Sequence, residues 1–143
     1  MIMEASPKAA PARGFTLIEL MIVVAVLGVL LLLVLPGYTE SVRKSQRADG
    51  MRFLMELASR QERFYAQNGT YTDDPNDLGL ESTTSSEGHY SLTVASCGAG
   101  IATCYKLTAT PIGGQAKDTK CANFSIDSLG QRTASGSLGD QCW

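Results

Sequence analysis

The sequence predicts an α+β protein in which a long N-terminal helix, membrane-spanning in its first half, packs on a small antiparallel β-sheet with disulfides. Three observations predict it. An apolar run lies near the N-terminus, a helical periodicity continues beyond that run, and short strand-like stretches with four cysteines follow. The 143 residues suit one domain plus a membrane element.

The composition limits the partners. The formal net charge is −2, the pI is about 5.3 and only 18% of the residues are charged. These values give the chain no general attraction to nucleic acid, so any polyanion would need a local basic patch.

The apolar run covers residues 15–35 and is interrupted in polarity only by Thr16 and Glu19. As a helix it would span about 31 Å, which matches a bilayer core of roughly 30 Å. Residues 1–14 precede it and lack the apolar core of an ordinary signal peptide. Membrane lipid is therefore an expected partner of the run.

The segment RGFTLIELMIVVAVLGVLLLLVLPGY resembles the prepilin signature of type IV pilins and pseudopilins. The resemblance implies the type IV pilin fold, removal of the leader by a prepilin peptidase between Gly14 and Phe15, and N-methylation of Phe15. It also implies that Glu19 is the family's buried assembly acid. Gly28 and Pro36 fall where the family carries helix-breaking residues.

A charge argument supports a role for Glu19 independently of the resemblance. A carboxylate at membrane depth costs a few kcal/mol and needs a partner. The amine that cleavage creates at Phe15, in the same or a neighbouring subunit, is the nearest candidate. The alternative is that Glu19 only complements the helix dipole, an effect of at most about 1–2 kcal/mol.

Basic residues flank the apolar run on both sides. They are Lys8 and Arg13 before it and Arg43, Lys44, Arg47 and Arg52 after it. Counting these charges would place the C-terminal side in the cytoplasm. The cysteines and the leader indicate the opposite: a single-pass protein of the bacterial inner membrane with its C-terminal domain in the periplasm, and later an extracellular pilus.

Residues 36–68 continue as an amphipathic helix that enters the globular domain, with a kink expected near Pro36. The expected apolar strips contain Val42, Met51, Leu54, Met55, Ala58 and Tyr65, and Phe53, Leu57 and Phe64. The expected polar face contains Arg43, Lys44, Arg47, Arg52, Arg60, Glu62 and Arg63. Asn68 and Gly69 tolerate the left-handed conformation that ends a helix.

The remaining chain is predicted as a connecting loop, residues 69–88, and a C-terminal region, residues 89–143, with a sheet and disulfides. The predicted strands are residues 89–95, 105–110, 121–127 and, as a short return, 131–134.

Four cysteines in a polar half indicate two disulfides formed in an oxidising compartment. We favour Cys97–Cys104, which would close a hairpin, and Cys121–Cys142, which would tie down the chain end; other pairings stay open. The alternative, a zinc site with four thiolates, is disfavoured because the chain has no CxxC pattern.

The pattern FYAQNGTYT, the short strands and the region enclosed by Cys121 and Cys142 look like minor pilins of the PilE kind. The resemblance implies that residues 122–141 are an exposed, variable contact region. Trp143 is expected to cover the end of the core, with an exposed binding aromatic as the alternative.

No catalytic pattern stands out, so an enzyme, a cofactor or a metal is not expected. His89 is the only histidine and starts a predicted strand. Asp73, Asp74 and Asp77 lack the calcium-loop spacing of an EF-hand and are predicted to be turn residues.

The expected function is a structural minor pilin that is incorporated into type IV pili or primes their assembly, with roles in twitching and adhesion. The expected partners are the prepilin peptidase, other major and minor pilins and the inner-membrane assembly platform. One alternative is a DNA-receptor pilin, and another is a pseudopilin of type II secretion. A receptor could hold DNA phosphates with a patch of Lys106, Lys117, Lys120 and Arg132.

Overall fold

The computed structural model describes residues 14–143, except the side chains of residues 34–36. Of the predicted leader, only Gly14 lies within the described residues. The described chain divides after Tyr38 into two compact units, the second of which is residues 39–143.

A 52-residue helix, α1 (Leu17–Asn68), is the first described element. The N-terminal part of this helix is apolar, and it is long and apolar enough to cross a membrane. The helix ends as expected, because Gly69 has φ +71° and its N–H donates to the Tyr65 carbonyl at 2.8 Å. The Asn68 side chain also donates to the Phe64 carbonyl at 3.0 Å.

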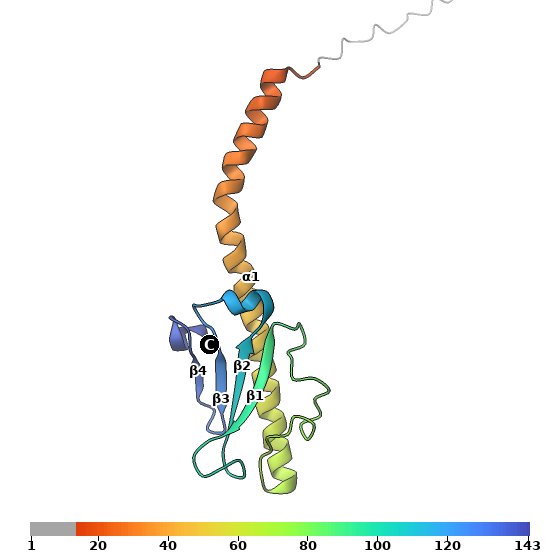
Figure 1. Cartoon of the computed structure of the whole chain (residues 1–143), viewed down its shortest axis with the longest axis vertical. Coiled ribbons are helices and arrows are strands. Elements are labelled where there is room, and N and C mark those ends of the chain that lie inside the picture. Colours follow the sequence, from red (N-terminus) through yellow and green to blue (C-terminus); the bar gives the residue numbers. More distant parts are fainter. Residues whose placement is uncertain (1–13) are drawn as a thin grey trace, which may run out of the picture. The chain divides into compact units, whose positions relative to one another are not determined.

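The second unit contains a four-stranded antiparallel sheet in the order β1-β2-β3-β4, which confirms the predicted meander (Figure 1). The strands are β1 (Tyr90–Ser96), β2 (Tyr105–Pro111), β3 (Phe124–Asp127) and β4 (Arg132–Ala134). Two short 3₁₀ helices, η1 (Gly113–Lys117) and η2 (Gly139–Cys142), follow β2 and β4.

The core of this unit lies between α1 and one face of the sheet. Phe53, Leu54 and Leu57 come from the helix and are all buried. The sheet contributes Tyr90, Leu92, Tyr105, Leu107, Ala109, Phe124 and Ile126. Burying one large apolar side chain stabilises a fold by about 1.5–3 kcal/mol, so this layer holds the sheet to the helix.

Gly50 faces Tyr90 where the helix meets the sheet. A Cβ at this position would sit 2.9 Å from two ring carbons of the fully buried Tyr90. A glycine inside a helix costs about 1 kcal/mol relative to alanine. Glycine is nevertheless required at position 50, because the Tyr90 ring occupies the space that a Cβ would need.

The prediction of the helix faces was wrong at three positions. Arg47 was placed on the polar face but is only 6% exposed, whereas Met55 and Tyr65 were placed on the apolar face and are 44% and 41% exposed. Periodicity does not reveal what covers each side of a helix. Arg47 is buried because Asp118, 71 residues later, contacts it.

The third strand also begins later than predicted, at Phe124 instead of Cys121. The preceding residues form a turn in which Ala122 has φ +50° and its N–H donates to the Asp118 carbonyl at 3.0 Å. A positive φ is incompatible with extended strand geometry, so pairing starts only after this turn.

Gly136 is a sensitive position of the C-terminal region. A Cβ there would overlap the Lys120 carbonyl group and the Cys121 nitrogen. We expect Gly136→Ala to lower the free energy of unfolding by about 1–3 kcal/mol, since backbone atoms must move. Gly114→Ala is the matched control, because a Cβ at Gly114 meets nothing within 4 Å. Urea unfolding of the two variants checks this, and equal stabilities would contradict it.

Candidate functional site

The apolar N-terminal part of α1 presents an exposed surface on all sides. Its large apolar side chains from Leu17 to Leu33 are between 48% and 76% exposed. Such a surface is unstable in water and stable in lipid or against other apolar helices. This part of the chain, residues 15–35, is called the stem below.

Glu19, the acid of the stem, forms a capping box with Thr16. The Thr16 backbone N–H and hydroxyl each donate to Glu19 Oε2 at 2.9 Å, and the Glu19 N–H donates to Thr16 Oγ1 at 3.3 Å. The box satisfies two backbone donors that a helix start leaves without partners. The sequence carried the pattern, Thr-x-x-Glu, but our sequence reasoning did not use it.

The two positions expected to break the stem helix are helical here. The helical backbone conformation continues through Gly28 and Pro36, so α1 is uninterrupted at both. Transmembrane helices tolerate such residues, because other groups can satisfy the carbonyl that a proline leaves free. Loss of helicity in an assembled filament stays a prediction.

Both predicted disulfides are present, Cys97–Cys104 and Cys121–Cys142. The first closes the connection between β1 and β2. The second joins the turn before β3 to the end of the chain. In the chain-entropy account, loops of these lengths stabilise a fold by about 2–4 kcal/mol each.

Trp143 covers one end of the core, as expected. Its ring packs edge-on against Phe124, with 5.5 Å between the ring centroids, and its Nε1–H donates to the Thr133 carbonyl at 2.8 Å. The Arg132 guanidinium lies over the indole, 5.5 Å from its centroid.

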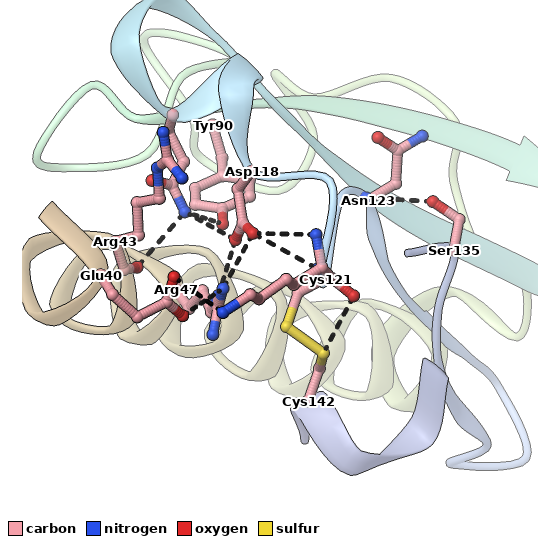
Figure 2. Close-up of polar contacts among 11 residues, drawn as sticks. Glu40, Arg43, Arg47, Tyr90, Asp118, Cys121, Asn123, Ser135 and Cys142 are labelled. Carbon is pink, nitrogen blue, oxygen red and sulfur yellow. Dashed lines mark hydrogen bonds and ion pairs between the residues drawn. A yellow bond between two sulfur atoms is a disulfide. The ribbon is translucent and has the colours of Figure 1, made fainter. Parts of the chain in front are cut away.

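A buried ion pair joins α1 to the segment after η1 (Figure 2). Arg47 Nε donates to Asp118 Oδ2 at 2.6 Å and Arg47 Nη2 donates to Asp118 Oδ1 at 2.8 Å, so the interaction is bidentate. Gln115, fully buried, donates to Asp118 at 3.3 Å and to the Tyr90 hydroxyl at 3.0 Å. The helix α1, the strand β1 and η1 with the residue that follows it therefore meet at one polar centre.

The surroundings fix the charge of this pair. Burial alone would raise the pKa of the Asp118 carboxyl, but hydrogen bonds and charge from Arg47, with N–H donors of Cys121 and Lys120, lower it overall. The hydrogen bonds from its guanidinium to Asp118 raise the pKa of Arg47. Both groups are charged at neutral pH.

Lys120 and Glu40 make a second link between the same two segments. The Lys120 ammonium lies 3.1 Å from Glu40 Oε2, and this hydrogen bond is the main cause that lowers the pKa of Glu40. Gln115 donates to the Arg43 carbonyl at 3.4 Å. The segment from 113 to 121 is thus packed on residues 40–47 of the helix.

The four residues predicted as a DNA patch do not lie on one surface. Lys106 is paired with Asp127 and Arg132 with Ile126 in neighbouring strands, so their side chains point to opposite faces of the sheet. Lys117 and Lys120 belong instead to the segment that packs on α1. Arg43 and Lys44 belong to the part of the helix on which this segment packs.

Sequence reasoning missed the buried polar residues that attach α1 to the rest of the unit. Asp49 accepts a hydrogen bond from Ser85 at 2.5 Å, and Gln61 exchanges two hydrogen bonds with the backbone of Thr72. The only signal in the sequence was a polar residue within an otherwise apolar strip.

Metal binding finds no support in the part of the chain that the structure describes, since no group of three His, Cys, Asp or Glu side chains is placed to hold an ion. Asp74 and Asp77 accept hydrogen bonds within the loop, from Asn76 and from Thr72. His89 is partly buried at the start of β1.

Two protein families match this chain. The family described as "Type IV minor pilin ComP, DNA uptake sequence receptor" matches residues 36–125, more than half of the chain. The "Prokaryotic N-terminal methylation motif" matches residues 10–35.

Curated relatives are pilins. The type IV major pilin protein PilA of Myxococcus xanthus is 37% identical over 68 residues, which are 48% of this chain and 31% of PilA. The fimbrial protein EcpC of Eikenella corrodens is 31% identical over 107 residues, 73% of this chain and 70% of EcpC. The type IV major pilin protein PilE of Neisseria gonorrhoeae is 33% identical over 78 residues, 54% of this chain and 47% of PilE. The chain thus spans less than half of PilA and PilE.

Solved structures agree with this fold. A type IV pilin from Shewanella oneidensis superposes with a TM-score of 0.50 at 25% identity, covering 71% of this chain and 97% of that pilin. The minor pilin PilV of Neisseria meningitidis superposes with a TM-score of 0.52 at 22% identity. The match covers 68% of this chain and 90% of PilV, and at this identity it supports only the fold. With an apolar stem, a helix packed on an antiparallel sheet and these relatives, the chain belongs to the type IV pilin family.

Proposed function

We propose that the chain is a minor subunit of a type IV pilus, structural rather than catalytic. A prepilin peptidase would remove residues 1–14, and the stem would then leave the lipid and pack among the stems of other pilins. The observation that carries the proposal is the exposed apolar surface around the stem up to Leu33, with one carboxylate, Glu19, near its start. Lipid can cover this surface in the precursor, and neighbouring stems can cover it in a fibre.

The proposed topology places residues 39–143 on the periplasmic side. The two disulfides support it, because disulfides persist in oxidising compartments. A subunit with this topology needs no further translocation before it enters a filament.

A deletion strain that is complemented with an epitope-tagged chain tests the proposal. We expect the tagged chain in the sheared pilus fraction, together with fewer pili or reduced twitching in the deletion strain. A chain that is absent from pili, in a strain whose pili and motility are normal, would refute it.

A second function, reception of DNA, is favoured by one specific observation. The matching family that covers residues 36–125 is described as a DNA uptake sequence receptor. Residues 39–143 carry ten Lys and Arg against twelve Asp and Glu, so any phosphate binding must be local. Lys117 is exposed and lies in the segment from 113 to 121, which also contains Lys120 and packs on the helix at Arg43.

We expect Lys117→Glu to weaken DNA binding. The slope of log K against log salt should become less steep by about one, which corresponds to the loss of one phosphate contact. The measurement is the fluorescence anisotropy of a labelled duplex with the full chain in neutral micelles. Lys106→Glu is the matched control, an exposed lysine on the outer face of the sheet. If wild-type protein does not bind the duplex even at low salt, the receptor function is excluded.

A further inference from the structure

The charges of residues 39–143 are distributed unevenly. The end of this unit where the segment from 113 to 121 packs on the start of its helical part is called the basic end. It contains five cationic residues and two carboxylates, a net charge of +3, whereas residues 39–143 as a whole carry −2. The basic end consists of Glu40, Arg43, Lys44, Arg47, Lys117, Asp118 and Lys120.

Internal ion pairs use only part of this positive charge. Asp118 forms an ion pair with Arg47, and Glu40 forms ion pairs with both Arg47 and Lys120. Lys44 and Lys117 are exposed and have no carboxylate partner among residues 14–143. At least these two cations are available for an external anion.

The basic end begins close to the stem along the chain. Arg43 and Lys44 follow Leu35, the last residue of the stem, by eight and nine residues. Eight helical residues advance about 12 Å, which is within the reach of the headgroup layer for long basic side chains. With residues 39–143 in the periplasm, as proposed, the four basic residues that follow the stem run against the usual charge bias of membrane proteins.

We propose that the basic end binds the headgroups of anionic phospholipids while the stem is in the membrane, with Arg43, Lys44 and Lys117 as the contacting side chains. Lys117 comes from a segment more than seventy residues away in sequence, so the site exists only in the folded unit. The contact retains the folded subunit at the membrane surface, and it is given up when the stem enters a filament. This inference goes beyond the function proposed above and does not require DNA binding.

The test uses the full chain in neutral-detergent micelles, titrated with dihexanoyl-phosphatidylglycerol and followed by amide NMR shifts. We expect saturable shifts at residues 40–47 and 113–120, and none with dihexanoyl-phosphatidylcholine. Lys44→Gln and Lys117→Gln should each weaken binding about fivefold, the equivalent of about 1 kcal/mol per basic side chain near an anionic surface. Lys106→Gln, the matched loss of one exposed lysine charge, should leave the affinity unchanged.

Four results would overturn the proposal. The first is equal binding of the two lipids. The second is an equal effect of Lys106→Gln and Lys117→Gln, which would indicate a response to net charge alone. The third is that glycerol phosphate binds as tightly as the anionic lipid. The fourth is that a short DNA duplex shifts these residues while the lipid does not, which would assign the basic end to nucleic acid.

Discussion

Replacing Asp118 by asparagine is expected to lower the free energy of unfolding of residues 39–143 by about 3–5 kcal/mol. Loss of one partner of a buried ion pair leaves the other charge without compensation in a low-dielectric site. Here that charge is Arg47, whose side chain is 7% exposed; it would lose its two hydrogen bonds to the carboxylate and keep only the longer contact to Glu40, at 3.3 Å. The measurement is urea unfolding of the full chain, followed by the fluorescence of Trp143, the single tryptophan.

Glu87→Gln is the matched control for this prediction. Glu87 also pairs with an arginine, Arg52, at 2.9 Å, but both side chains are at least half exposed, so we expect a loss of at most about 1 kcal/mol. The double variant Arg47→Met with Asp118→Leu should be markedly more stable than Asp118→Asn, since it removes both buried charges. Equal losses for Asp118→Asn and Glu87→Gln would show that the buried pair does not hold the segment from 113 to 121 on the helix.

The same pair predicts a pH dependence. Since the pKa of Asp118 is lowered from 3.8 in the folded state, its contribution is fully present above that value and is lost as the pH falls through the lower folded pKa. The stability difference between wild type and Asp118→Asn should be constant between about pH 5 and 7 and shrink below about pH 4. A difference that is unchanged at low pH would contradict this assignment.

Glu19→Ala is expected to leave cleavage after Gly14 intact but to reduce the incorporation of the chain into pili by about tenfold or more. A hydrogen bond to a charged group is worth about 1.5–3 kcal/mol, and in the fibre the carboxylate would pair with the amine of Phe15. The measurement compares the variant in the membrane and sheared pilus fractions with wild type.

Thr16→Ala separates this role from helix capping. It removes the hydroxyl that both donates to and accepts from Glu19, yet it keeps the carboxylate. Loss of a cap costs only about 1 kcal/mol, so we expect a much smaller defect than for Glu19→Ala. If the two variants incorporate equally poorly, capping explains the role of Glu19 and the assembly pairing is wrong.

Local patterns in the sequence were sufficient for much of this fold. The stem, the end of α1 at Asn68, and the disulfides Cys97–Cys104 and Cys121–Cys142 each follow from residues that are close in sequence or from short loops. Hydrophobic periodicity and turn chemistry act over a few residues, which is the range that such reasoning covers.

Long-range contacts explain what was missed. The burial of Arg47 depends on Asp118, and the four lysine and arginine residues proposed for DNA were grouped by their location in one half of the chain, not by strand register. Only the register shows that Lys106 and Arg132 lie on opposite faces. The basic end likewise unites two segments that no local pattern connects.

The central claim is that residues 15–35 serve first as a membrane stem and then as the packing helix of a filament subunit. Mass spectrometry of the N-terminal peptide of the chain, recovered from sheared pili, tests it most directly. We predict a peptide that begins at Phe15 and carries one added methyl group. Recovery of the chain only from a soluble fraction, still beginning at Met1, would contradict the account.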